Sequence, residues 1–311
     1  MRPPPRPADR SVVPEASFYS RRQRFATVGS TNDVVREWLA GGVGEVALAV
    51  ADEQTAGRGR EGRTWIAPRG AALLASVGFR PAWISPERTW QIPATVSLAM
   101  AEAAEDVAGL AARSVQLKWP NDLMLRDGDG GESSGEWLAG ASPSTSEGRV
   151  AAHGPDYRKL AGVLGESEGL GTSDPRVVVG IGVNVDWRAD AFPHELSTSM
   201  TSLRAASGRP VQVTALLDAF SLNLESRIAE LRTGTFDVAE FAGRQLTGGR
   251  IVTLELPDGT VDEVRALTVD VETGALVVAD PTAPGGERQV FSGEIRHLRL
   301  ADLAVPDRVR V

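Results

Sequence analysis

The sequence contains no cysteine, and this absence removes several classes of function from consideration. Disulfide scaffolds, thiolate metal sites, cysteine nucleophiles and thiol redox chemistry are all excluded. Histidine is scarce as well, because the chain has only His153, His194 and His297. These three lie far apart and form none of the short spacings that zinc sites use, which argues against a zinc enzyme.

Long apolar stretches are also missing. No run approaches the roughly 18 apolar residues that a membrane-spanning helix needs, and the first residues, MRPPPRPADRSVVP, lack the apolar segment of a signal peptide. The formal net charge is −8, with 33 basic against 41 acidic residues, which argues against a nucleic-acid or membrane partner. We therefore expect a cytoplasmic protein. For its assembly, a monomer or a weak homodimer is expected.

Two polar residue types are rare, and their positions become informative below. Only two of the 33 basic residues are lysines, Lys118 and Lys159, and the chain has four asparagines. A chain that uses arginine almost everywhere can keep lysine where a compact ammonium on a flexible stem is needed. The alternative interpretation is that the two lysines only reflect composition.

The chain length of 311 residues predicts about two domains. Pro and Arg dominate the start, so residues 1–24 are expected to form a flexible arm. Apolar patterns predict helices and strands up to about residue 246, interrupted by a Gly/Ser-rich insertion at 126–155 that we expect to be mobile. The expected helices begin near residues 30, 88 and 213, and the expected strands are 46–50, 73–79, 114–119, 160–166 and 176–185.

The C-terminal part has a different pattern. After about residue 247, short strands alternate with PDG, ETG and PGG turns, which is typical of a small all-β barrel. Further upstream, Pro120 is expected to end a strand and to place Asn121 and Asp122 in a turn.

The densest motif is QTAGRGREGRTW at residues 54–65. Its glycines allow close approach of the backbone to a ligand, and Arg58, Arg60 and Arg63 supply guanidinium groups that match carboxylate or phosphate. The motif is not a Walker A loop. It can also be explained as a flexible surface loop or an RNA-binding patch.

Four further strings occur in a fixed order: GSTND at 29–33, KWPND at 118–122, KLAGVLGE at 159–166 and GIGVNV at 180–185. Together with the arginine loop and the tail FSGEIRHLR, they resemble the biotin protein ligases, the biotin–[acetyl-CoA carboxylase] ligases, over about residues 25–302. Both lysines and three of the four asparagines fall inside these strings, which favours a functional explanation of their rarity.

The resemblance implies an α+β fold. A catalytic domain at 25–246, with a mixed sheet like that of class II aminoacyl-tRNA synthetases, would precede a small Src-homology-3-like β-barrel at 247–305. About 25 residues precede the GSTND string, fewer than a winged-helix DNA-binding domain needs, so the resemblance is to the monofunctional ligases.

The resemblance also implies the reaction. Biotin and ATP, with Mg²⁺, would form biotinyl-5′-AMP and pyrophosphate, with no tightly bound prosthetic group. The biotinyl group would then pass to a lysine of a biotin carboxyl carrier domain of acetyl-CoA, acyl-CoA or pyruvate carboxylase.

Site residues follow from the matching strings. The resemblance assigns biotin binding to Ser30, Thr31, Asn32, Gln54, Gly57, Arg58, Gly59, Arg60, Lys159 and Gly162. It assigns ATP or adenylate binding to Arg58, Arg60, Arg63, Trp65, Lys118, Asn121 and Asn184. It assigns catalysis to Lys159, Arg60, Asp122 and Lys118, with Asp122 as the candidate Mg²⁺ ligand.

Some of these roles remain open. Asp122 can hold Mg²⁺, orient Lys159 or accept a proton from the incoming lysine. Trp65 can stack on adenine, or it can belong to the core, as we expect of Trp119. Ser30, Thr31 and Asn32 can instead cap a helix.

Two loops and four glycines are also expected to contribute to the site. Segments 57–63 and 187–196, both polar and loop-like, are expected to close over the adenylate. Glycines 162, 165, 180 and 182 are expected to bring strands close to the ligand.

Three alternatives to a biotin ligase are kept. The first is a lipoate–protein ligase of the same fold. The second is a nucleic-acid-binding module built on the arginine loop, and the third is a non-catalytic biotin sensor.

Overall fold

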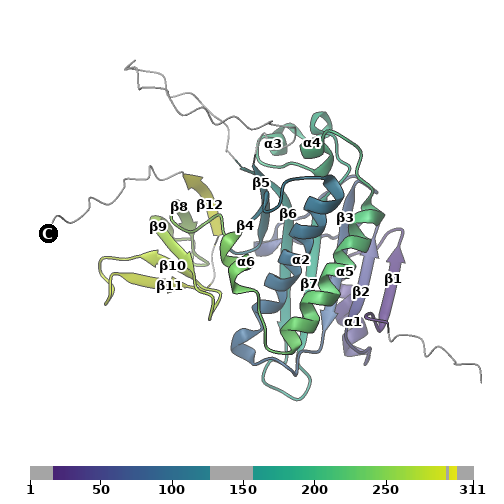
Figure 1. Cartoon of the computed structure of the whole chain (residues 1–311), viewed down its shortest axis with the longest axis horizontal. Coiled ribbons are helices and arrows are strands. Elements are labelled where there is room, and N and C mark those ends of the chain that lie inside the picture. The colour runs from purple at the N-terminus through teal and green to yellow at the C-terminus, as the bar shows by residue number, and fades with distance from the viewer. Residues whose placement is uncertain (1–16, 127–156, 292–293, 300–311) are drawn as a thin grey trace, which may run out of the picture.

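The computed structural model describes residues 17–126, 157–291 and 294–299. They form a large mixed β-sheet with helices on both faces, followed by a smaller antiparallel sheet (Figure 1). Nearly all of the predicted 126–155 insertion and most of the N-terminal arm lie outside the described residues. Within this part of the chain, no helix is both long and apolar enough to cross a membrane.

The large sheet has seven strands in the order β1-β2-β3-β7-β6-β5-β4. β1 and β2 run parallel, and every other neighbouring pair is antiparallel. The strands are β1 (Arg21–Phe25), β2 (Ala47–Ala51), β3 (Ala72–Phe79), β4 (Val115–Lys118), β5 (Asp122–Arg126), β6 (Tyr157–Glu168) and β7 (Arg176–Asn184). The strands expected from the apolar patterns are confirmed.

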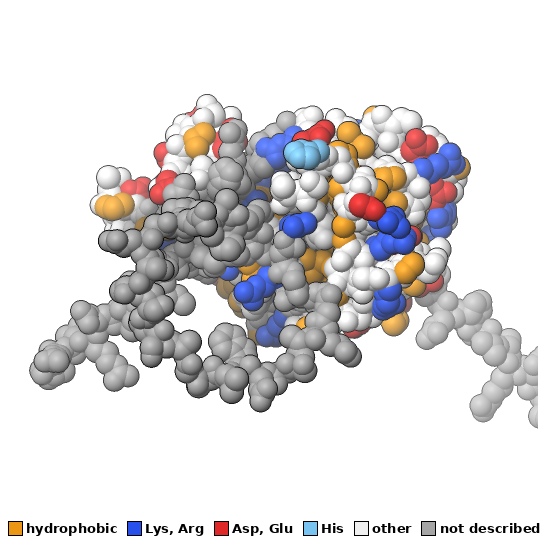
Figure 2. Space-filling view, turned by 90° about the horizontal axis from the view of Figure 1, so that it is seen from above, with side chains coloured by type: hydrophobic (Ala, Val, Ile, Leu, Met, Phe, Trp, Pro, Cys, Tyr) orange, Lys and Arg blue, Asp and Glu red, His pale blue; other side chains and the backbone are white. Residues whose placement is uncertain are grey.

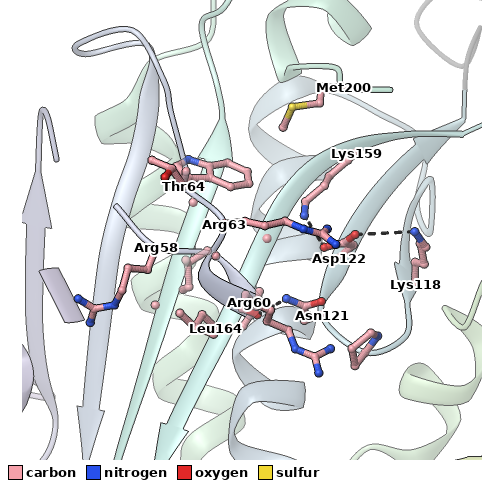
Figure 3. Close-up of a pocket in the computed structure, with 18 of the residues that line it drawn as sticks. Arg58, Arg60, Arg63, Thr64, Lys118, Asn121, Asp122, Lys159, Leu164 and Met200 are labelled. Carbon is pink, nitrogen blue, oxygen red and sulfur yellow. Dashed lines mark hydrogen bonds and ion pairs between the residues drawn. The ribbon is translucent and has the colours of Figure 1, made fainter. Parts of the chain in front are cut away.

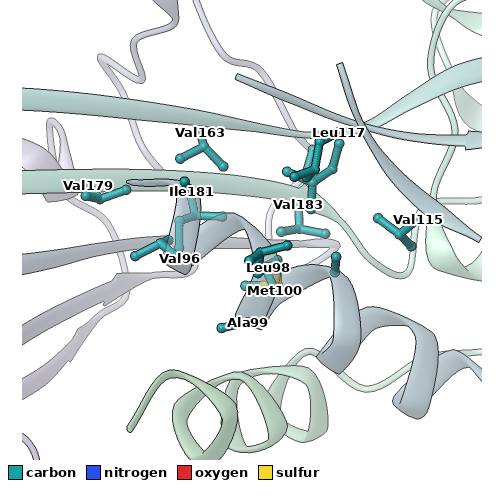
Figure 4. Packing of buried hydrophobic residues seen from close by; sticks show 14 of the residues in the cluster. Val96, Leu98, Ala99, Met100, Val115, Leu117, Val163, Val179, Ile181 and Val183 are labelled. Carbon is teal, nitrogen blue, oxygen red and sulfur yellow. The ribbon is translucent and has the colours of Figure 1, made fainter. Parts of the chain in front are cut away.

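One face of this sheet carries the main core. Helices α2 (Gln91–Ala108) and α5 (Val213–Arg232) lie across it (Figure 1). Alternate residues of β7, such as Val179 and Ile181, point into this core and pack on α2 (Figure 4). The alanine-rich sequence of α2 leaves it buried along most of its length, because small side chains let the sheet and α5 approach from both sides.

The opposite face is only partly covered. Helix α1 (Thr31–Ala40) packs on β2, β3 and β7 through Val35 and Leu39, which form a separate small core. A Cβ at Gly78 would lie 2.4 Å from Val35 Cγ1, so this strand position must be glycine for α1 to sit so close. α1 does not cover the rest of this face, which includes Gly162 and Gly182.

The first described strand begins within the expected N-terminal arm. The prediction of a flexible arm over residues 1–24 is wrong for Arg21–Arg24, which belong to the edge strand β1. Backbone pairing with β2 holds this strand, while its side chains are mostly exposed. A polar edge strand of this kind has no apolar alternation that would reveal it in the sequence.

The KWPND string also differs in one respect. Asn121 lies in a turn as predicted, but Asp122 is the first residue of β5, where it pairs with Lys118 of β4 and Gly162 of β6. Trp119 is buried, as expected for a core residue. The hairpin thus places Asp122 inside the sheet and not on a free loop.

The remaining helices are short, and among them α6 (Val238–Gly243) connects the large sheet to its C-terminal neighbour. The others are α3 (His194–Ser197) and α4 (Leu203–Ser207), with single 3₁₀ turns η1 (Arg60–Gly62), η2 (Pro86–Arg88) and η3 (Ala189–Ala191). After α6, the Thr247 hydroxyl accepts a hydrogen bond from the Trp119 backbone, which ties the link between the two sheets to β4.

The C-terminal part consists of strands, as expected, but in the described part of the chain these strands do not form the closed barrel that was predicted. Its strands are β8 (Ile251–Glu255), β9 (Val261–Val269), β10 (Leu276–Ala279), β11 (Glu287–Val290) and β12 (Glu294–Arg299). The order β11-β10-β9-β8-β12 leaves β11 and β12 at opposite edges. Within the described residues the sheet is therefore open. The turn residues in the sequence predicted each hairpin, but they do not specify whether the two outer strands pair with each other.

Candidate functional site

A cavity of about 920 Å³ lies on the sheet face opposite α2 and α5. Its walls come from the start of α1, the loop 54–65, the β4–β5 hairpin, β6, β7 and the segment 196–200. All the site residues predicted from the sequence line it except Gly57 and Asn184. Strings that are up to about 150 residues apart are therefore brought together, as the resemblance implies.

The two lysines meet at one carboxylate. Lys159 Nζ lies 2.6 Å from Asp122 Oδ1, and Lys118 Nζ lies 4.0 Å from Asp122 Oδ2 (Figure 3). All three side chains are at most 29% exposed, so water screens the pairs only in part. Of the roles left open for Asp122, this geometry matches the orientation of Lys159.

The charge of the cavity is opposite to that of the chain. Asp122 is the one carboxylate among the described residues that line it, against the cationic side chains of Arg60, Arg63, Lys118, Lys159 and Arg250 and the residue Arg58, whose guanidinium is turned to Asp33. The face shown in Figure 2 instead has basic side chains scattered among acidic and apolar ones. A concentrated positive potential inside a cavity suits a small anionic ligand better than a nucleic-acid backbone.

The described residues provide little for a metal ion. They contain no group of three or more His, Asp or Glu side chains that could hold one. Asp122, the candidate ligand, has an ammonium group near each carboxylate oxygen. This arrangement does not fit a Mg²⁺ site built by the protein alone.

The loop 54–65 is a compact hairpin above the cavity. The backbone of Gly59 donates to the Arg63 carbonyl, and Trp65 donates to that of Gly57, at 2.7 and 3.0 Å. A Cβ at Gly57 would lie 2.8 Å from the Trp65 carbonyl oxygen, so Gly57 permits the hairpin to close. Its structural role explains why it does not line the cavity.

Arg58 holds this hairpin to α1. Its guanidinium donates to both carboxylate oxygens of Asp33, at 2.8 and 2.7 Å, and points away from the cavity (Figure 3). The hydrogen bond from Arg58 lowers the pKa of Asp33 from 3.8 to about 2. The side chain of Arg58 thus acts on the loop, and its backbone is left as the part that can face a ligand.

This pair gives a testable pH dependence. Because folding lowers the pKa of Asp33, its stabilising contribution is complete above the unfolded value of 3.8 and is lost as the pH falls towards about 2. The difference in unfolding free energy between wild type and Asp33→Asn should therefore shrink as the pH falls from neutrality to below 4. Urea titrations at several pH values measure it. Asp218→Asn, at an exposed pair 3.5 Å from Arg22, is the control and should change stability little at any pH.

The N-terminus of α1 is capped from outside the helix. Ser30 occupies the capping position, but its side chain makes no capping hydrogen bond. Gln54 Oε1 instead accepts from the Thr31 backbone N–H at 2.7 Å. The capping interpretation is therefore wrong for Ser30, and Gln54 joins the loop to the helix.

A polar network runs beneath this end of the cavity. Ser76 Oγ lies 2.6 Å from both Thr31 Oγ1 and Asn32 Oδ1, and Asn32 Nδ2 donates to Glu166 Oε2 at 2.6 Å. The sequence reasoning assigned no role to Ser76 or Glu166. A lone serine within the apolar strand LLASVGF was the available signal.

Three glycines of β6 and β7 form the floor. A Cβ at Gly182 would lie 2.5 Å from Trp65 Cε2, one at Gly162 3.2 Å from Trp65 Cζ3, and one at Gly180 2.2 Å from Asn32 Oδ1. These glycines therefore accommodate protein side chains as well as leaving room for a ligand. The expectation is wrong for Gly165, whose Cβ would face Pro93 on the core side.

Replacing Gly182 tests this packing. Gly182→Ala is expected to displace Trp65 and to lower the unfolding free energy by about 1–3 kcal/mol, the usual cost of overpacking. Gly165→Ala is the matched control, since its added Cβ would meet Pro93 at an ordinary 3.5 Å. Urea denaturation of both variants measures the effect, and equal stability of the two would contradict the assignment.

Trp65 itself lies flat against this floor. Lys159 Nζ is 5.6 Å from the centre of its ring, and the buried Trp65 Nε1 has no hydrogen-bond partner within the described structure. Stacking on adenine remains a prediction for this residue.

Two predicted elements are placed differently from expectation. Asn184 is fully buried, and its Nδ2 donates to the Thr201 carbonyl at 2.9 Å instead of facing the cavity. Segment 187–196 is less polar than expected, because Trp187 and Phe192 are buried and stack at 4.2 Å. Beyond it, the backbone of Lys159 pairs with Met200, which lines the cavity.

The C-terminal part also contributes to the cavity wall. Arg250, just before β8, lines the cavity, and its guanidinium lies 5.6 Å from the centre of the Tyr157 ring. Nothing in the local sequence around Arg250 distinguishes it from the other arginines. Only the docking of the two sheets places it here.

Comparison with known proteins agrees with this architecture. The sequence matches the biotin/lipoate A/B protein ligase family over residues 25–184, just over half of the chain. It is 27% identical over 291 residues to the biotin–[acetyl-CoA-carboxylase] ligase of Mycobacterium tuberculosis, covering 93% of each protein. It is 31% identical over 216 residues to the ligase of that name from Paracoccus denitrificans, covering 68% of this chain and 75% of the relative.

A solved structure shows the same fold. The biotin protein ligase from Aquifex aeolicus in complex with biotin and ATP superposes with a TM-score of 0.65 and 24% identity, covering 90% of this chain and 99% of that chain. The sequence matches and the clustering of the ordered strings in one cavity both support the same family assignment. The chain belongs to the biotin/lipoate A/B protein ligase family.

Proposed function

We propose that this chain is an ATP-dependent biotin protein ligase. It joins biotin to ATP as biotinyl-5′-AMP, releases pyrophosphate, and transfers the biotinyl group to a lysine of a biotin carboxyl carrier domain. The observation that carries the proposal is the cavity, which is lined by one carboxylate and by five cationic side chains besides that of Arg58, next to a polar end built on Thr31 and Gln54. The names of the two ligases reported above support the same reaction.

The first half-reaction needs cations because it brings two anions together. The biotin carboxylate attacks the α-phosphorus of ATP, and the bond from this phosphorus to pyrophosphate breaks. At an effective dielectric constant of about 20, two unit charges 4 Å apart repel by about 4 kcal/mol. Cations placed in the partly buried cavity offset this repulsion and the charge that develops on the α-phosphate.

Lys159 is the residue we assign to this step. Its ammonium is held 2.6 Å from Asp122, at the edge of the cavity floor and beside the Trp65 ring. From this position it can bind the biotin carboxylate and the oxygen that bridges the acyl group and the phosphate. Arg60, Arg63 and Lys118 are assigned to the phosphates because they line the same region.

The second half-reaction is acyl transfer. The ε-amine of the acceptor lysine attacks the carbonyl of the adenylate, AMP leaves, and an amide forms with loss of one proton from the amine. The acceptor belongs to a carrier domain of a biotin-dependent carboxylase.

Mg²⁺ is proposed only as the ion that accompanies ATP. Because both oxygens of Asp122 face ammonium groups, the phosphates would supply most of its ligands. No step is assigned to an ion bound by the protein alone.

The reaction is tested by exchange of labelled pyrophosphate into ATP. Biotin is expected to support exchange, and lipoate, the substrate of the alternative ligase, is expected to support little. A second assay follows transfer of biotin to a purified carrier domain and to a control in which the acceptor lysine is replaced by arginine. Exchange that depends on lipoate but not on biotin would replace the proposal with lipoate ligation.

A further inference from the structure

Glu166 is connected to Thr31 by an unbroken chain of hydrogen-bonding groups beneath the cavity. Glu166 contacts Asn32, Asn32 contacts Ser76, and Ser76 contacts Thr31, each at 2.6 Å. Ser76 is completely buried, and Asn32 and Thr31 are 5% and 2% exposed. Glu166, at the end of the chain, is 31% exposed. Water therefore competes little for the contacts of Ser76, and these groups must satisfy one another.

The chemistry of Glu166 sets the direction of the first link. Its carboxylate pairs with Arg36 at 2.8 Å and lies 3.8 Å from Arg58, and a carboxylate offers only acceptor atoms. Asn32 must then turn its Nδ2 towards Glu166. Its oxygen, Oδ1, is thereby directed at Ser76.

Counting protons fixes the remaining links. Three oxygen–oxygen contacts follow one another: Asn32 Oδ1 to Ser76 Oγ at 2.6 Å, Ser76 Oγ to Thr31 Oγ1 at 2.6 Å, and Thr31 Oγ1 to Gln54 Oε1 at 3.1 Å. The two amide oxygens carry no hydrogen, so the two hydroxyl protons can bridge only two of the three contacts.

The distances identify the contact that has no proton. At 2.6 Å a hydrogen must lie between two oxygens, whereas 3.1 Å is longer than an ordinary O–H···O bond. Ser76 therefore donates to Asn32, and Thr31 donates to Ser76. Thr31 Oγ1 and Gln54 Oε1 are left as two acceptors side by side.

This pair of acceptors determines what the end of the cavity can bind. Both residues line the cavity, and the Thr31 hydroxyl has already committed its proton. An N–H donor placed between the two oxygens satisfies both of them. A group without such a donor leaves the lone pairs of Thr31 Oγ1 that face the cavity unpaired and leaves Gln54 Oε1 with the Thr31 backbone N–H as its one donor, which is unfavourable.

We propose that Ser76 and Glu166 are positioning residues that determine substrate specificity. Together they hold the Thr31 hydroxyl as an acceptor, so that this end of the cavity requires a ligand with an N–H group. The ureido ring of biotin has this group, and the dithiolane ring of lipoate lacks it. The inference rests on the proposed function, because it takes biotin as the ligand.

Ser76→Ala tests the link nearest the ligand. Without Ser76, the Thr31 hydroxyl turns its proton to Gln54 Oε1 and fills the position of the ligand N–H. The KM for biotin in pyrophosphate exchange should rise about tenfold, the effect of losing roughly one hydrogen bond. The KM for ATP and kcat should change less than about twofold, since neither depends on this end of the cavity.

The decisive readout is discrimination between biotin and its analogues methylated on either ureido nitrogen. Wild type should reject at least one analogue strongly, and Ser76→Ala should reduce that rejection about tenfold. Ser97→Ala is the matched control, because it removes another buried hydroxyl, one that donates to the Pro93 carbonyl within α2. It should leave the discrimination unchanged.

Glu166 is tested by a pair of variants. Glu166→Ala frees the Asn32 amide to rotate, which reverses the chain and again sends the Thr31 proton to Gln54. Glu166→Gln keeps a carbonyl oxygen that can accept from Asn32, so it should recover most of the lost discrimination. A structural role through the Arg36 ion pair alone predicts no such recovery, since both variants remove the charge.

The outcomes separate the two hypotheses. If wild type shows no biotin-dependent exchange, the proposed function fails, and this inference fails with it. If exchange occurs but Ser76→Ala weakens biotin and its methylated analogues equally, the proposed function stands and the inference is overturned. Loss of discrimination in Ser76→Ala and Glu166→Ala, with recovery in Glu166→Gln, supports it.

Discussion

Lys159→Ala is expected to lower kcat/KM for biotin-dependent pyrophosphate exchange by at least about 10³-fold, a loss in the upper range for removal of one group that stabilises transition-state charge. The ammonium of Lys159 lies at 2.6 Å from Asp122 in a partly buried cavity. Its removal takes away a cation and leaves Asp122 with Lys118 at 4.0 Å as its one remaining lysine neighbour. The assay compares variant and wild type at saturating ATP.

Two further variants make this result interpretable. Lys159→Arg keeps the charge but replaces a compact ammonium with a larger planar group, so it should also be impaired, though less than Lys159→Ala. Arg22→Ala removes one positive charge from the exposed strand β1 and should exchange pyrophosphate like wild type. Normal turnover by Lys159→Ala would refute the catalytic assignment and favour a non-catalytic biotin sensor.

Arg244→Met is expected to have the largest effect on stability, lowering the unfolding free energy by about 3–5 kcal/mol. The Arg244 side chain is 2% exposed and donates to both oxygens of Glu105, at 2.6 and 2.9 Å. It also donates to the Val115 carbonyl and to Glu240. Its loss leaves the carboxylate of Glu105, itself 5% exposed, buried without its ion-pair partner.

A matched control uses the same acceptor. Arg113 donates to Glu240 at 2.7 Å but is 56% exposed, so Arg113→Met should cost less than about 1 kcal/mol. The double variant Glu105→Leu with Arg244→Met should recover part of the loss, because no buried charge is left alone. Urea denaturation measures all three. Equal losses for Arg113→Met and Arg244→Met would show that burial does not govern this network.

Arg244 also shows what sequence reasoning could not find. As one of 31 arginines, it has no motif around it, and its partners Glu105 and Val115 are more than 125 residues away. Ser76 and Arg250 are similar cases. The role of each comes from neighbours that only the folded chain supplies.

The predicted site residues divide along the same line. Lys118 and Lys159 were predicted because a rare residue type lay within the ordered strings, Asp122 was predicted from the KWPND string, and the structure brings the three together. Arg58 was predicted as a site residue, but the direction of its side chain was not. The sequence offers a guanidinium for a ligand, whereas Asp33 of α1 takes that guanidinium and leaves the backbone to face the cavity.

By itself, the sequence determined the alternation of helices and strands, the change to an all-β tail, and the set of polar residues able to bind anions. Local apolar periodicity and turn residues encode the first two, and residue type encodes the third. Tertiary structure alone decided that Arg21–Arg24 form an edge strand, that Asn184 faces Thr201, and that the hydroxyls of Thr31 and Ser76 are hydrogen-bonded to each other. The physical reason is that backbone pairing, burial and the direction of a hydrogen bond depend on groups distant in sequence, which no local pattern specifies.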